Sequence, residues 1–132
     1  MISIIIPAYN SDTIERAIDS ILVQRISHQE IIIIDDSIDK KIQQTIQNIN
    51  HTDIKYYKNT KNLGTTLSRI KGIQIAQGDY IGFLDDDDVM INNNLEKKLK
   101  QINEGQVDFV FCDYIINNMI NNTTIKKTLY QY

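Results

Sequence analysis

Several residue types are scarce in this chain: it has one cysteine, one proline and no tryptophan. The lone cysteine, Cys112, excludes an internal disulfide framework and a zinc site built from cysteines. No apolar run approaches the roughly 18 residues of a membrane-spanning helix, and the short apolar start has no basic flank typical of a signal peptide. Basic residues are also in the minority, 14 against 17 acidic ones, which argues against nucleic acid as the main partner.

The remaining composition is that of an ordinary globular protein. With 132 residues, 42% of them hydrophobic and 23% charged, the chain can bury a core, and we expect one domain over residues 1–132. We expect it in the cytoplasm, a reducing compartment.

Apolar runs and helical spacing alternate along the chain. Short apolar runs predict strands at residues 3–6, 31–34, 54–58, 80–84 and 107–112. Apolar residues at helical spacing predict helices at residues 14–22, 38–49 and 64–76, and a last helix with Leu95, Leu99 and Ile102 on its apolar face. Cys112 ends the fifth run and is expected to be buried, and the tail from Tyr114 predicts a hairpin around Asn121 and Asn122.

This alternation predicts an α/β fold with a mostly parallel sheet and helices on both faces. In such sheets ligands bind beyond the carboxyl ends of the strands, where the strand order reverses. Three predicted strands end in unusual polar sequence, at Pro7–Asn10, Asp35–Ser37 and Asp85–Asp88. We therefore expect a ligand site where these three ends meet.

The run Asp85–Asp88 places four carboxylates side by side. Two carboxylates about 4 Å apart repel by roughly 1 kcal/mol in water and about 4 kcal/mol at an effective dielectric constant of 20, so a cation is expected nearby. Oxygen ligands of this kind suit Mg²⁺ or Mn²⁺, with a ligand's phosphates completing the shell. Two alternatives stay open: a solvated acidic loop before the next helix, and an aspartate-nucleophile phosphatase of the haloacid dehalogenase type, with Asp85-x-Asp87-x-Val89 as its signature.

A second constellation is Asn62-x-Gly64 followed by Arg69 and Gly72. Gly64 permits a tight turn before a helix, and Arg69 inside that helix can reach a nucleotide or phosphate, or else form a surface ion pair. The pair Asp35-Asp36 is ambiguous alone: it can cap a helix, bind a metal or accept hydrogen bonds from a ligand. No Walker-type or G-x-G-x-x-G glycine loop is present, so ATPase and Rossmann oxidoreductase functions lack their phosphate-binding loop.

Taken together and in order, these segments resemble the family 2 glycosyltransferases, which have the GT-A fold. The resemblance rests on Ser3–Asn10, Glu30–Ser37, Asn62–Gly72 and Gly78–Asp88, and it extends to Val107–Tyr114. It implies an inverting, metal-dependent transfer of a sugar from a nucleotide-diphosphate donor, usually a UDP-sugar, to an acceptor hydroxyl on a glycan or lipid-linked molecule.

The resemblance also implies a role for each matching residue. Pro7, Ala8 and Tyr9 line the nucleotide base and ribose, and Asp36 accepts a hydrogen bond from the base. Arg69 lies near the nucleotide. Asp85 and Asp86 help to hold the ribose and the hydrated metal. Asp87 ligates the Mn²⁺ or Mg²⁺ that bridges the diphosphate.

This chain departs from the family pattern in three places, one of which is Ile70, where the family often has Asn after the arginine. The second polar loop lacks the usual glycine, since Ser37 follows Asp36 directly. The acceptor-binding half is absent, so we expect the fold to be truncated at its C-terminus and the general base to lie beyond Tyr132. An alternative from another class is a non-catalytic module that binds the nucleotide sugar. Membrane association, if it occurs, is expected to be peripheral and to use the missing segments.

Overall fold

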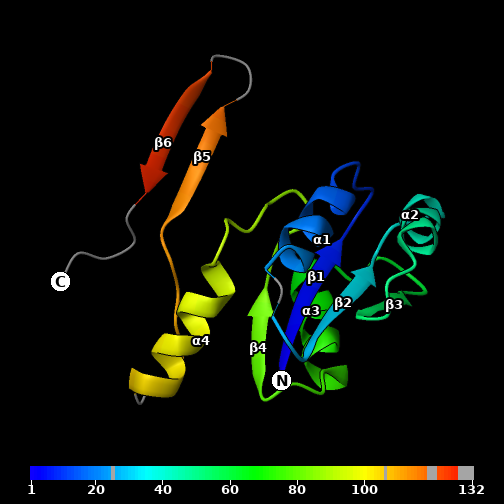
Figure 1. Ribbon diagram of the computed structural model, residues 1–132. Coiled ribbons are helices and arrows are strands. Elements are labelled where there is room, and N and C mark those ends of the chain that lie inside the picture. Colours follow the sequence, from blue (N-terminus) through cyan, green and yellow to red (C-terminus); the bar gives the residue numbers. More distant parts are fainter. Residues whose placement is uncertain (25, 106, 119–121, 128–132) are drawn as a thin grey trace. The chain divides into compact units, whose positions relative to one another are not determined.

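The computed structural model describes residues 1–24, 26–105, 107–118 and 122–127. The chain divides into two compact units, residues 1–94 and residues 95–132. The first unit holds four strands: β1 (Ile2–Ala8), β2 (Gln29–Asp35), β3 (Ile54–Lys58) and β4 (Tyr80–Phe83). They form one parallel sheet in the order β3-β2-β1-β4 (Figure 1).

Strands β1 and β2 form the centre of the core. Every residue of β1 is buried, and in β2 only Gln29 is partly exposed, as expected of strands covered on both faces. Ile5 of β1 pairs with Ile32 of β2 and with Phe83 of β4. Because strand β1 has β2 on one side and β4 on the other, the strand order reverses next to β1.

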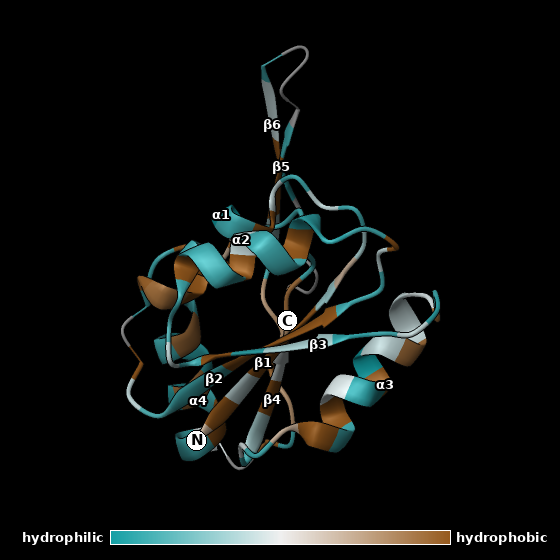
Figure 2. Ribbon diagram, turned by 90° about the vertical axis from the view of Figure 1, so that its right-hand side faces the viewer, coloured by the Kyte–Doolittle hydropathy of each residue, from teal (hydrophilic) through white to brown (hydrophobic). Residues whose placement is uncertain are grey.

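Helices cover both faces of the sheet (Figure 2). Helices α1 (Ile14–Leu22) and α2 (Lys41–Ile49) lie on one face, and α3 (Thr65–Ile75) lies on the other, against β1 and β2. Gly72 permits the close approach of α3, because a Cβ atom there would lie 2.4 Å from Ile5 Cγ2. This arrangement confirms the predicted α/β architecture.

The second unit contains most of helix α4 (Asn94–Gly105) and a two-stranded antiparallel hairpin. The hairpin pairs β5 (Tyr114–Asn118) with β6 (Thr123–Lys127), which confirms the predicted hairpin; Asn121 itself lies outside the described residues. Among the described residues, no helix is both long and apolar enough to cross a bilayer.

Three sequence predictions are wrong in detail. Residues 107–112 form no strand, and Phe109 and Phe111 stack on each other with their ring centroids 6.0 Å apart. An apolar run becomes a strand only when its backbone finds a pairing partner, and pairing in this unit begins at Tyr114. Cys112, predicted to be buried, is therefore exposed. Ile38, predicted to lie on the apolar face of the second helix, precedes α2 and is 88% exposed.

Candidate functional site

A pocket of about 330 Å³ lies at the carboxyl ends of β1, β2 and β4, where the strand order reverses. Its volume is in the range of small-molecule sites, and its position is the one expected for a ligand in an open parallel sheet. The pocket brings together the predicted site residues Pro7–Tyr9, Asp36 and Asp85–Asp87. The strand ends that the sequence identified as polar do meet in space.

Two pocket residues, Thr65 and Ser68, were missed by sequence reasoning. They lie one turn apart at the start of α3, so they share a face of that helix. Their spacing after Gly64 is the signal that identifies them, because the first helical turn after a tight glycine turn faces the same loop.

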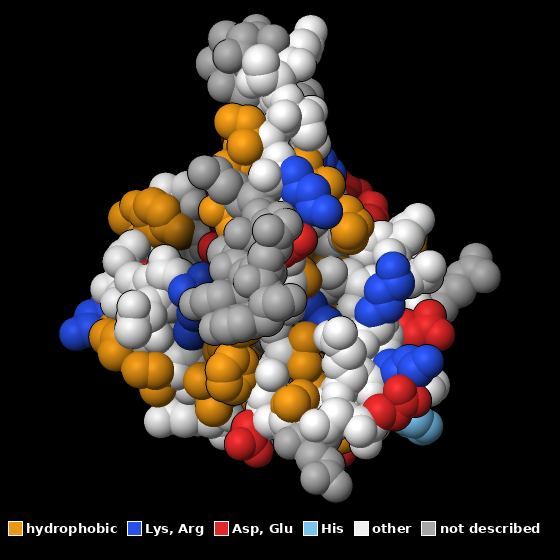
Figure 3. Space-filling view, turned by 90° about the vertical axis from the view of Figure 1, so that its left-hand side faces the viewer, with side chains coloured by type: hydrophobic (Ala, Val, Ile, Leu, Met, Phe, Trp, Pro, Cys, Tyr) orange, Lys and Arg blue, Asp and Glu red, His pale blue; other side chains and the backbone are white. Residues whose placement is uncertain are grey.

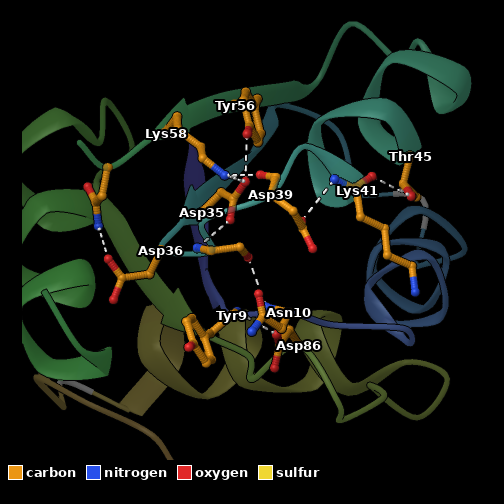
Figure 4. Close-up of polar contacts among 12 residues, drawn as sticks. Tyr9, Asn10, Asp35, Asp36, Asp39, Lys41, Thr45, Tyr56, Lys58 and Asp86 are labelled. Atoms are coloured by element: carbon orange, nitrogen blue, oxygen red, sulfur yellow. Dashed lines mark hydrogen bonds and ion pairs between the residues drawn. The ribbon is translucent and has the colours of Figure 1, made fainter. Parts of the chain in front are cut away.

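The loop after β1 is fixed to two neighbouring loops, as Figure 4 shows. The Tyr9 amide donates to Asp86 Oδ2 at 3.0 Å, and the Thr13 hydroxyl donates to the Asp86 carbonyl oxygen at 2.9 Å. The backbone amide of Asn10 donates to Ser37 Oγ at 2.8 Å, and the Asn10 backbone is left-handed, with φ of 49°. These bonds hold Tyr9, whose side chain is 52% exposed, at the rim of the pocket.

The acidic loop carries more negative charge than its surroundings compensate. Burial raises the pKa of Asp86, and the neighbouring Asp87 carboxylate raises it further, against the Tyr9 hydrogen bond. Burial also raises the pKa of Asp88, with added repulsion from Asp87 and Asp85. A nearby cation would relieve this repulsion.

Asp85 is the member of the loop that has a cationic partner. The Arg69 guanidinium donates to Asp85 Oδ1 and lies over the Phe83 ring, 5.7 Å from its centroid. The structure thus places Arg69 beside the acidic loop. Of the two partners, Asp85 is among the residues that line the pocket and Arg69 is not. An ion pair is one of the two outcomes that the sequence left open for Arg69.

Asp87 lines the pocket and makes no hydrogen bond or ion pair with the part of the chain that the structure describes. Within that same part, no three His, Cys, Asp or Glu side chains are grouped to hold a metal ion by themselves. Mg²⁺ is commonly bound by one or two carboxylates with substrate phosphates and water completing the shell, so the residues present fit that mode. Asp87 is the carboxylate available for it.

Asp36 closes the side of the pocket toward α3. Its carboxylate accepts hydrogen bonds from Asn59 Nδ2 at 2.8 Å, from the Leu63 amide at 2.8 Å and from the Gly64 amide at 2.7 Å. Burial acts to raise the pKa of Asp36, but these three donors lower it overall. Gly64 has φ of 79°, which a residue with a side chain adopts only with strain.

Asp35 points away from Asp36, toward Tyr56 and Lys58 (Figure 4). It accepts a hydrogen bond from the Tyr56 hydroxyl at 2.6 Å and pairs with Lys58 Nζ at 2.9 Å. Burial raises the pKa of Tyr56, and the hydrogen bond to Asp35 raises it further. The ambiguity of the Asp35-Asp36 pair is thus resolved by strand alternation, because only Asp36 lines the pocket.

Comparison with known proteins decides the family. Residues 3–131 match the family described as "Glycosyl transferase family 2". This chain belongs to that family. The match spans all four strands of the parallel sheet and every pocket residue.

Two relatives of this family 2 chain illustrate the likeness in sequence. An "Uncharacterized glycosyltransferase" of Haemophilus influenzae is 37% identical, over 98% of this chain and 55% of its own length. WfgD of Escherichia coli, a "UDP-Glc:alpha-D-GlcNAc-diphosphoundecaprenol beta-1,3-glucosyltransferase", is 30% identical over 96% of this chain and 50% of its own length. The chain therefore spans about half the length of these curated relatives.

A solved structure shows the same fold. The S. aureus protein TarS, residues 1–349, superposes with a TM-score of 0.73 and 27% sequence identity, over 81% of this chain and 33% of TarS. The family 2 chain thus has the GT-A architecture that its sequence resembles.

Proposed function

We propose that this chain forms the donor-binding part of an inverting glycosyltransferase that uses a UDP-sugar and Mn²⁺ or Mg²⁺. The observation that carries the proposal is the pocket at the strand-order reversal, lined by Tyr9 on one side and by Asp85–Asp87 on the other. The family match and the UDP-glucose donor in the name of WfgD support it. Donors of this type are cytosolic, so we propose a cytoplasmic location.

The donor nucleotide lies against Pro7, Ala8 and Tyr9. Asp36 accepts four hydrogen bonds from three donors of its own chain, because the Leu63 amide donates to both carboxylate oxygens. A donor on the base would take the place of the longer Leu63 bond, at 3.0 Å. Asp86 holds the Tyr9 backbone through its carboxylate, so the base-binding loop and the acidic loop are placed together.

The diphosphate of the donor lies beside the acidic loop, where like charges repel unless a cation intervenes. Asp87 would hold the metal ion, and Arg69 would fix Asp85 next to it. When bound, the metal offsets the negative charge that grows on the departing nucleoside diphosphate.

In the proposed reaction, an acceptor hydroxyl attacks the anomeric carbon from the face opposite the leaving group. A bond forms between the acceptor oxygen and the anomeric carbon, and the bond from that carbon to the diphosphate oxygen breaks. The hydroxyl proton passes to a general base of the enzyme. The acceptor is a glycan or a lipid-linked glycan, in keeping with the diphosphoundecaprenol acceptor in the name of WfgD. The phosphatase alternative needs a free Asp85 nucleophile and is disfavoured by the ion pair of Asp85 with Arg69.

Calorimetric titration of the chain with UDP, with and without Mn²⁺, tests donor binding without needing an acceptor. We expect binding that strengthens with Mn²⁺, because Asp87 would hold the ion and the ion would offset the charge of the diphosphate. Asp87→Ala is expected to remove the metal dependence. Without metal its affinity for UDP should be equal to or higher than that of the parent chain, because the variant lacks a negative charge that repels the diphosphate.

Asp88→Ala is the matched control, because it removes the same charge one residue away and Asp88 does not line the pocket. It should retain the metal dependence. Absence of UDP binding by the parent chain, or equal loss of metal dependence in both variants, would contradict the proposal.

A further inference from the structure

A buried amide connects the pocket residue Asp36 to helix α3. Asn59 directly follows β3, is only 6% exposed and does not line the pocket. Its Nδ2 donates to Asp36 Oδ1 at 2.8 Å and to Ser68 Oγ at 3.1 Å, and its Oδ1 accepts from Lys71 Nζ at 2.7 Å. One side chain at the end of β3 therefore joins the loop after β2 to helix α3.

The partners of this amide fix its orientation. A lysine ammonium can only donate and an ionised carboxylate can only accept, so the amide oxygen faces Lys71 and the amide nitrogen faces Asp36. Both bonds involve a charged group, which makes them stronger than bonds between neutral groups. No other side chain of this length offers a donor and an acceptor in one plane, so the site is specific for asparagine.

The consequence for the pocket runs through the Asp36 carboxylate. The oxygen that accepts from Asn59 also accepts from the Leu63 amide, and the other oxygen accepts from the Gly64 amide at 2.7 Å. Residues 62, 64 and 65 form the pocket wall next to these bonds. The position of the Asp36 carboxylate therefore sets the position of the backbone that forms this pocket wall.

We infer that Asn59 is a positioning residue of the donor pocket, acting through Asp36, and that Lys71 holds the Asn59 amide in its working orientation. The inference rests on the proposed function in one respect, namely that the pocket binds the UDP part of a donor. Its structural part, control of the Leu63–Gly64 backbone, stands apart from any ligand.

The decisive variant is Asn59→Asp, which keeps the size of the side chain and the acceptor for Lys71. It replaces the donor that faces Asp36 with a second carboxylate oxygen. Two readouts are needed on the full 132-residue chain: amide hydrogen exchange at Leu63 and Gly64 without ligand, and calorimetric titration with UDP. We expect exchange about tenfold faster at both amides and UDP binding about tenfold weaker, which corresponds to the loss of about one hydrogen bond.

Ser3→Ala is the matched control, because it also removes a buried hydrogen bond, from the Ser3 hydroxyl to Glu30, but at the opposite end of the sheet. It should lower the unfolding temperature while leaving exchange at Leu63 and Gly64 and the UDP affinity within about twofold of the parent chain. If Asn59→Asp does not fold, Lys71→Met takes its place, with shifts of about threefold in the same directions.

Each outcome bears on the inference. Unchanged exchange at the two amides in Asn59→Asp, or equal changes in Ser3→Ala, would overturn it. Faster exchange with unchanged UDP affinity would overturn the link to the donor pocket. A parent chain that does not bind UDP refutes the proposed function, and the exchange measurement then decides the positioning role alone.

Discussion

The amino end of the parallel sheet and the acidic loop at its carboxyl end treat carboxylates in opposite ways. At the amino end, Glu30 is 3% exposed. Its carboxylate accepts hydrogen bonds from the Ser3 hydroxyl and from the backbone amide of Gln77, and it forms an ion pair with Lys55 at 2.6 Å. Burial acts to raise the pKa of Glu30, but these partners lower it overall. At the carboxyl end, the pKa values of Asp86 and Asp88 are instead raised, by burial first and by neighbouring carboxylates next.

The difference separates a structural charge from a functional one. The amino end holds its carboxylate with a cation and two donors supplied by the chain, so it is complete without a ligand. In the acidic loop only Asp85 has a cationic partner among the described residues, and the remaining repulsion disfavours the free protein. Such a loop gains most when a cation and a polar ligand bind. On the face drawn in Figure 3, side chains of both charge signs are interspersed among apolar ones.

The largest effect is expected at the amino end. Glu30→Ala leaves Lys55, the Ser3 hydroxyl and the Gln77 amide without their shared acceptor and should lower the free energy of unfolding by about 3 kcal/mol. Urea denaturation measures this loss. Glu15→Ala on the exposed side of α1 is the control and should change stability by less than about 0.5 kcal/mol. A Glu30→Ala chain as stable as the control would remove the distinction between the two ends.

A smaller loss of stability is expected when the pH is lowered. The pKa values of Glu30, Asp35 and Asp36 are lowered in the folded chain, so each contributes stability above its ordinary value, 4.5 for Glu and 3.8 for Asp. That stability is lost as the pH falls through the lower folded values. Urea midpoints measured from pH 6 downward should therefore decrease below about pH 4.5, since the protons bind the unfolded chain first. In Glu30→Gln the decrease should be shallower, and an identical slope would contradict the role given to Glu30.

The smallest effect is expected in the acidic loop. Because the pKa of Asp88 is raised, its charge opposes folding once the pH exceeds its ordinary value, and this opposition is complete above the raised value. Asp88→Asn should thus stabilise the metal-free chain at pH 7 by less than about 1 kcal/mol, since the group is exposed. At pH 3 the gain should vanish. Thermal unfolding at both pH values checks this, and destabilisation at pH 7 would count against a repulsive loop.

The sequence predicted the sheet and the pocket residues of the strand ends, because strand periodicity and chain order together decide which loops meet. It could not predict Asn59, since the importance of this residue comes from partners that folding alone brings near: no motif marks an asparagine after β3. Residues 107–112 show the other limit. An apolar run predicts a strand, but pairing depends on a partner that the run itself does not contain.

The pairing of β1 with β4 has a consequence for synthesis. Ile2 pairs with Tyr80, so one edge of β1 stays without its neighbour until β4 has also been translated. At about 5–20 residues per second, this interval is on the order of 4–16 s. For that time the backbone edge of Ile2–Ile5 stays unpaired, in a segment with high β propensity and no charge, and we expect ribosome-bound chaperones to shield it.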